Sequence, residues 1–167
     1  MSDVSEVLLW DRLNKRLTAA TLYDELTLAQ VAAAAASWQP LIDDRVAVLK
    51  QQSGPVKDWP QHAHWDWNRK ANLVSGLLAY QLLGVECEGQ MQGLMLTGTV
   101  GQCRINTQAG KPLVVVHFLT TAPWNLPSFV SQPRFGLVGK VLIAAAVQLS
   151  VGTRNRLINR VYSLYSK

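Results

Sequence analysis

Apolar positions along the chain predict helices first and strands later. Two series of helical spacing occupy the first fifty residues: Leu9, Leu13 and Leu17, then Leu28, Val31, Ala32 and Ala35. Thr27 precedes the second series and Gln30 follows three residues on, which is the pattern of a capping box. Pro40 is expected to separate this helix from another one over LIDDRVAVLKQQ, because proline interrupts helices. We therefore predict a helical lead-in over residues 1–53.

The middle of the chain predicts a loop, a helix and a β-hairpin. SGPVKDWPQHAH (53–64) is rich in Gly and Pro and reads as a loop. WDWNRKANLVSGLL (65–78) returns to helical spacing, with these inward candidates: Trp67, Leu73, Val74 and Leu77. YQLLGVEC and QMQGLMLTGTV then flank Glu88 and Gly89, which favour a tight turn between two strands.

The last third predicts a strand, a long loop, a helix and a final strand. The valines of PLVVVHFLTT (112–121) indicate a central strand that is buried on both faces. The loop APWNLPSFVSQP leads to a helix over about 137–150, which Gly152 ends, and RLINRVYSL (156–164) reads as a strand. A strand, helix and strand in this order favour parallel pairing with a right-handed crossover. The expected fold class is α+β, an α/β sandwich in one domain over 1–167.

Charge is distributed unevenly. All eleven Asp and Glu residues lie between Asp3 and Glu88, so residues 1–88 carry 8 basic and 11 acidic side chains, a net of −3. Residues 89–167 carry 8 basic side chains and no acidic one, a net of +8. Such asymmetry indicates a surface that attracts an anion, unless acids from the first half fold back onto the second.

Composition narrows the class of protein. The chain of 167 residues suits one domain, contains no apolar run long enough for a membrane span, and does not begin with a signal-peptide pattern. Cys87 and Cys103 provide neither a disulfide framework nor a metal-ligand pair. We expect a cytoplasmic protein with free thiols and without a membrane or nucleic-acid partner.

RFGLVGK (134–140) is the strongest candidate for a ligand-binding loop. It offers Gly136 and Gly139 for close approach to the backbone, and Arg134 and Lys140 as cations, just before an apolar helix. The N-terminus of a helix presents unpaired N–H groups that bind phosphate. The loop is neither a P-loop nor a dinucleotide fingerprint. An ordinary turn into a helix remains the alternative.

The segment HFLTTAPWN…QPRFGLVGKVLIAAAVQLS resembles the acyl-CoA-binding core of the GNAT superfamily of N-acetyltransferases. The resemblance covers residues 58–164, and its most specific parts are Trp-Asp-Trp and Ala-Pro-Trp-Asn. It implies a mixed β-sheet with flanking helices that splays beside the valine strand to admit acetyl-CoA or another acyl-CoA as co-substrate. No metal is implied. The activity implied is acyl transfer to an amine acceptor whose identity is unknown.

The resemblance also implies which residues of this chain would form the acyl-CoA-binding site. The pyrophosphate would lie on the loop of Arg134, Phe135, Gly136, Leu137, Val138, Gly139 and Lys140. The pantetheine arm would lie along the strand end at Leu119, Thr120 and Thr121.

Three departures from the family pattern open an alternative. Leu137 stands where the family has the first glycine of Gly-x-Gly. The sequence ends at Lys167, so a shortened C-terminus is expected, without the later helix and strands that wall the acceptor pocket. The central strand has no carboxylate base, and His117 is the titrating side chain available there, with Glu86 and Glu88 as fallbacks. The alternative is a non-catalytic, truncated GNAT-like module that binds CoA or a protein partner.

Two further interpretations concern metals and assembly. His62, His64 and Asp66 are close in sequence, but no third ligand of sensible spacing follows, so a helix N-cap region packed by Trp65 and Trp67 is the preferred interpretation. A sheet that ends early exposes an edge, and pairing with a second copy is a common remedy. We therefore expect a homodimer.

Overall fold

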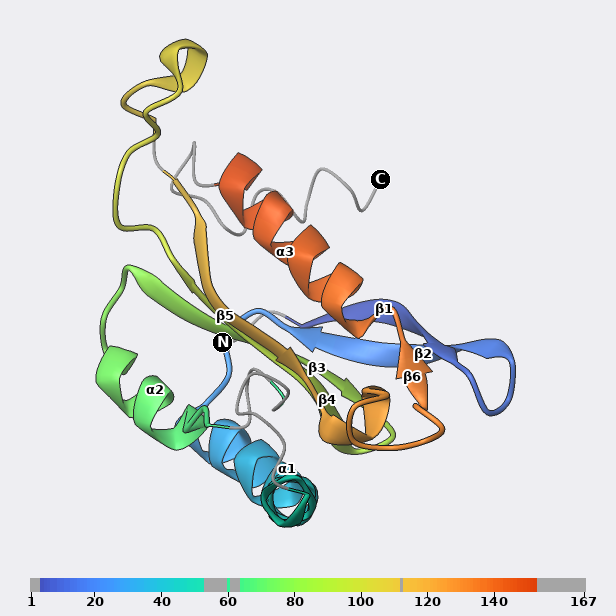
Figure 1. Ribbon diagram of the computed structural model, residues 1–167. Coiled ribbons are helices and arrows are strands. Elements are labelled where there is room, and N and C mark those ends of the chain that lie inside the picture. The colour runs from blue at the N-terminus through green and yellow to red at the C-terminus, as the bar shows by residue number, and fades with distance from the viewer. Residues whose placement is uncertain (1–3, 53–59, 61–63, 112, 153–167) are drawn as a thin grey trace.

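The computed structural model describes residues 4–52, 60, 64–111 and 113–152. The chain begins with a β-hairpin and not with a helix (Figure 1). Strands β1 (Val4–Asp11) and β2 (Arg16–Tyr23) pair antiparallel over their whole length. The predicted helical lead-in is therefore wrong for this part. Leu9, Leu13 and Leu17 fall on β1, on the turn and on β2, so their helical spacing does not mark one face of a single element.

Two helices follow. Helix α1 (Leu28–Gln51) begins with the predicted capping box, in which the Thr27 hydroxyl accepts from the Gln30 N–H and the Gln30 side chain accepts from the Thr27 N–H. Pro40 is exposed inside this one helix and does not divide it, contrary to prediction. Trp38 and Ile42, on either side of Pro40, are both buried against the sheet, so tertiary packing holds the two halves in one helix.

Helix α2 (Trp67–Val74) is shorter than the predicted element. Trp67 is buried as expected and Val74 is half-buried, whereas Leu73 and Leu77 are largely exposed. Ala71 is the other buried residue of α2. Most of the loop expected over 53–64 lies outside the described residues.

The predicted hairpin is confirmed. Strands β3 (Tyr80–Cys87) and β4 (Gln90–Gly98) pair antiparallel, and Glu88 and Gly89 both adopt positive φ in the turn between them. Residues 102–106 do not prolong β4, and a 3-10 turn, η2 (Asn106–Gln108), lies in the connection that follows.

The valine strand β5 (Val115–Thr121) is antiparallel to β4 and stands at an edge of the described sheet, whose order is β5-β4-β3-β2-β1-β6. The prediction of a central, doubly buried strand is therefore wrong for the described chain. Every pairing in this sheet is antiparallel. The mixed sheet expected from the resemblance stays a prediction, because the strand expected over 156–164 lies outside the described residues.

The chain then passes through a 3-10 turn, η3 (Pro123–Asn125), and the two-residue strand β6 (Phe135–Gly136) into helix α3 (Val138–Gly152). The helix prediction for this segment is confirmed. Helix α3 covers one face of the sheet, and α1 and α2 lie on the other (Figure 1). Gly93 in β4 allows close approach of α3, since a Cβ there would stand 2.5 Å from Cγ1 of Val138. The fold class is α+β.

No helix in the described part of the chain is long and apolar enough to cross a membrane.

Candidate functional site

The loop between β5 and α3 is held by a buried network centred on Gln92 of β4. The Gln92 side-chain oxygen accepts from the Trp124 indole N–H at 2.8 Å and from the Asn125 amide at 2.9 Å. The Gln92 amide nitrogen donates to the carbonyls of Cys87 and Gln90. The side chains of the Ala-Pro-Trp-Asn segment therefore fasten the loop to the β3–β4 hairpin.

The same network positions the residues just before α3. The Asn125 side-chain oxygen accepts from the Phe135 N–H at 2.9 Å, and this bond is buried. Phe135 and Gly136 then pair with Asp11 and Trp10 of β1. The start of α3 is thus fixed from two sides, by the Gln92 side chain of β4 through Asn125 and by the pairing of β6 with β1.

Leu137 is the residue that takes the backbone conformation of a glycine. Its φ is +72°, a left-handed value that costs a non-glycine residue about 1–2 kcal/mol. Its side chain is 40% exposed. Gly139 in the first helical turn is half-buried, with its Cβ position 3.9 Å from Leu119. The Leu137 backbone is therefore strained, while its side chain is partly exposed to solvent.

Two cations of the loop, Arg134 and Lys140, were named from the sequence, and the structure adds a third, Arg12. Arg134 forms an ion pair with Glu88 at 2.5 Å and lies over the Phe135 ring. Lys140 is exposed on the first turn of α3. Arg12 was missed because its segment was assigned to a helix. A Cβ on Gly136 would stand 3.4 Å from the Arg12 side-chain Nε, and the Arg12 N–H donates to the Arg134 carbonyl.

Two ionisable groups beside Arg134 have shifted pKa values. The pKa of Asp11 is lowered mainly by a hydrogen bond from the Asn14 side chain. Burial opposes this shift, whereas the Asn14 and Leu13 N–H groups and the charge of Arg134 lower the pKa further. Burial first, and then the charge of Glu88, raises the pKa of the Cys87 thiol. Asp11 therefore remains an anion, whereas Cys87 is a buried neutral thiol and a poor nucleophile.

The strand-end residues Leu119, Thr120 and Thr121 are packed in the protein. Leu119 packs with the core under α3, and Thr120 is buried. The Thr121 hydroxyl oxygen is buried and has no hydrogen-bond partner among the described residues. These three residues lead along β5 toward the loop.

The candidate bases do not meet at this loop. The exposed His117 ring lies against Tyr80, with ring centroids 5.6 Å apart, on the sheet face that carries α1 and α2. Glu88 is held by Arg134. Glu86 forms a hydrogen bond with the Tyr23 side chain. Burial raises the pKa of Tyr23 most, and the charge of Glu86 and this hydrogen bond raise it further. The structure therefore brings neither His117 nor Glu86 to the loop, and Glu88 reaches the loop only in its ion pair with Arg134.

The segment before α2 is a helix cap, as predicted. The Asp66 carboxylate accepts from the Arg69 N–H at 2.9 Å, and the Trp65 ring packs edge-on to Trp67 and Phe118. His62 lies outside the described residues. Within the residues that the structure does describe, no three His, Cys, Asp or Glu side chains gather as metal ligands would.

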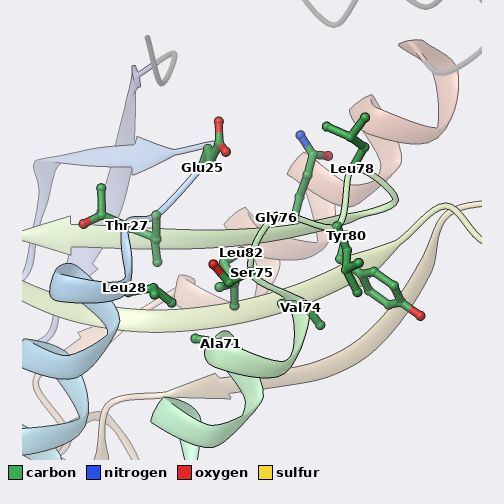
Figure 2. A pocket seen from close by; sticks show the side chains of 13 residues that line it. Glu25, Thr27, Leu28, Ala71, Val74, Ser75, Gly76, Leu78, Tyr80 and Leu82 are labelled. Carbon is green, nitrogen blue, oxygen red and sulfur yellow. The ribbon is translucent and has the colours of Figure 1, made fainter.

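A cavity of about 410 Å³ lies at the opposite end of β3 from this loop (Figure 2). Its walls come from the start of α1, the end of α2 and the start of β3, and include Glu25, Thr27, Ala71, Val74, Tyr80 and Leu82. Strand β3 runs from this cavity at Tyr80 to the turn at Glu88, a span of roughly 25 Å at the rise of a β-strand. The cavity and the 134–140 loop are therefore separate sites.

Fold and loop define an α+β protein with a candidate anion-binding turn. Comparisons of the chain with protein-family models, with curated proteins and with solved structures find no match.

Proposed function

We propose that the protein binds an acyl-CoA, with the pyrophosphate against the first turn of α3, and transfers the acyl group to an amine acceptor. The observation that carries the proposal is the turn at Gly136 and Leu137, where the Arg12 side chain lies 3.4 Å from the Cβ position of Gly136 and where Arg134 and Lys140 flank the turn in the sequence. Arg12 comes from the first hairpin, whereas Arg134 and Lys140 belong to the loop itself, and the positive end of the dipole of α3 lies behind the turn.

Binding would change the pairing of Arg134. A pyrophosphate on the turn offers this guanidinium stronger partners than the half-exposed Glu88 carboxylate, because charge-assisted bonds to phosphate are bidentate and a surface ion pair contributes only about 0–1 kcal/mol. The pantetheine arm would follow Leu119 and Thr120, and the unpartnered Thr121 hydroxyl would bond one of its amides.

Acyl transfer requires the amine to attack the thioester carbon and to lose a proton, while the carbon–sulfur bond breaks and CoA leaves as a thiolate that takes up a proton. Since His117 lies on the other face and Glu88 is paired, that proton would pass to water. The same observation favours a second candidate function, a non-catalytic module that binds CoA or a protein partner.

Calorimetric titration of the protein with acetyl-CoA and with CoA tests the binding step. We expect micromolar affinity, and a loss of at least about tenfold in the Arg134→Ala, Lys140→Ala double variant, since each charge-assisted bond contributes about 1.5–3 kcal/mol. Arg69→Ala removes an exposed cation of α2 and is the matched control. Absence of binding at millimolar ligand would exclude both the acyltransferase and the CoA-binding module.

A panel of primary amines, assayed for release of free CoA, separates the two candidates. Acyltransferase activity requires CoA release that depends on the amine and falls in the double variant. Tight binding without release in the presence of any amine would leave the non-catalytic module.

We also propose a homodimer. Two features support it: the edge of β5, which has no partner strand among the described residues, and the exposed apolar side chains of α3, Ile143, Val147 and Val151. Sedimentation equilibrium decides the question, because a species of one chain's mass at all concentrations would contradict it.

A further inference from the structure

The β1–β2 hairpin has an apolar face that no described element covers. Leu8, Trp10 and Leu17 are 49%, 39% and 53% exposed. The register places Trp10 opposite Leu17 and Leu8 opposite Ala19, and directly paired residues point to the same side of a sheet. The hairpin extends beyond α1 and α3, away from the body of the protein (Figure 1). These side chains therefore form one continuous patch near the hairpin tip.

The tip is preformed and presents a leucine. Leu13 is 70% exposed at its end. The buried Asp11 carboxylate accepts from the Leu13 N–H at 3.0 Å, from the Asn14 N–H at 3.1 Å and from the Asn14 side chain at 2.7 Å. Lys15 completes the turn with a φ of +51°. The exposed position of Leu13 is thus fixed by hydrogen bonds that are already made.

Cations flank the apolar patch. Arg12, Lys15 and Arg16 are exposed, and none of them forms an ion pair with a carboxylate among the described residues. The patch therefore combines exposed leucines and a tryptophan with three uncompensated positive charges.

The combination of an apolar patch with positive charges indicates which kind of partner fits the hairpin. A second copy docked patch to patch would bring two sets of three cations together, and like charges across an interface cost free energy. A nucleic acid would use the cations and could stack on Trp10, but it offers nothing apolar to Leu8, Leu13 and Leu17. An anionic bilayer satisfies both features, because headgroups attract Lys and Arg, Trp favours the interface, and leucines enter the acyl boundary.

We propose that the β1–β2 hairpin docks onto an anionic lipid surface, with Leu13 and Trp10 entering the interface and the flanking cations among the headgroups. Peripheral docking needs no membrane-spanning helix. A membrane partner was not expected from the sequence, because no apolar run is long enough for a membrane span. The proposal is independent of acyl-CoA binding, and its test avoids Arg12, which belongs to both sites.

Cosedimentation of the full chain with vesicles tests the proposal. We expect binding to phosphatidylcholine vesicles that contain phosphatidylserine, weaker binding to pure phosphatidylcholine, and a loss with added salt. Each of Lys15→Gln and Arg16→Gln is expected to weaken binding about fivefold, from about 1 kcal/mol per basic residue near the surface. Leu13→Ser is expected to weaken it at least about tenfold, since burial of a leucine is worth about 1.5–3 kcal/mol.

Matched controls lie on α2. Leu73→Ser changes a leucine that is 67% exposed, and Arg69→Gln removes an exposed cation, so both should bind vesicles like the wild type. Circular dichroism verifies that each variant is folded. Absence of binding to anionic vesicles, or equal losses in the α2 controls, would overturn the proposal. The proposal would also be overturned if the Leu13 and Lys15 changes left vesicle binding intact and instead weakened the binding of a single-stranded oligonucleotide or self-association of the protein.

Discussion

Asn125 is expected to be the most sensitive polar side chain of the loop before α3. Asn125→Ala removes the acceptor of the buried Phe135 N–H and one of the two donors to the Gln92 side-chain oxygen. Leaving a buried N–H unsatisfied costs about 1–3 kcal/mol, and loss of the second hydrogen bond costs about 0.5–1.5 kcal/mol. Gln92 keeps its bond from Trp124, which limits the second cost. The free energy of unfolding should therefore fall by about 2–4 kcal/mol.

Urea unfolding measures this change, followed by tryptophan fluorescence. For a chain of this size, about 1 kcal/mol corresponds to a shift of about 2–4 °C in Tm, so thermal unfolding should show a decrease of about 4–16 °C. Hydrogen exchange at the Phe135 amide gives a local measure, because this N–H should lose its protection. Gln132→Ala changes an exposed residue of the same loop and serves as the control.

The reasoning would be refuted if Asn125→Ala cost less than about 0.5 kcal/mol, the range of ordinary surface substitutions. A Phe135 amide that stays protected in the variant would also contradict it. Either result would mean that the loop is held by its apolar contacts and not by the network around Gln92.

Three further predictions follow from packing, capping and charge. Gly93→Ala would place a Cβ 2.5 Å from Val138 and 3.0 Å from Leu142, so urea unfolding should show a loss of about 1–3 kcal/mol from overpacking. Thr27→Ala removes the side-chain cap of α1 and should cost about 1 kcal/mol in the same assay. The lowered pKa of Asp11 stabilises the protein above the ordinary value of 3.8, and this contribution is lost as the pH falls through the folded-state pKa. The stability difference between wild type and Asp11→Asn should therefore shrink in urea titrations as the pH is lowered from neutral to below 3.8.

Predictions from the sequence were confirmed for elements whose structure depends only on residues close together in the chain. The capping box of Thr27, the turn at Glu88 and Gly89, and the helix after Leu137 are all present. Each depends on hydrogen bonds or backbone angles within a few residues. The candidate loop was located for the same reason.

Periodicity failed where the residues that carry the spacing belong to different elements of the fold. Leu9 and Leu17 fit a helix face at intervals of four, yet Leu9 is buried under α3 and Leu17 is exposed on the opposite side of the hairpin. The valines before His117 indicated burial on both faces, but β5 stands at the edge of the described sheet. Strand order depends on partners far along the chain, and no local pattern records it.

The sequence by itself determined the α+β class, the second hairpin, the caps and the position of the loop before α3. Only the tertiary structure decided which side chains meet there. It placed Arg12 beside Gly136, paired Arg134 with Glu88, and directed His117 to the other face. The physical reason is that charge and hydrogen bonding act over a few ångströms in space, whereas these residues are separated by tens to more than a hundred positions along the chain.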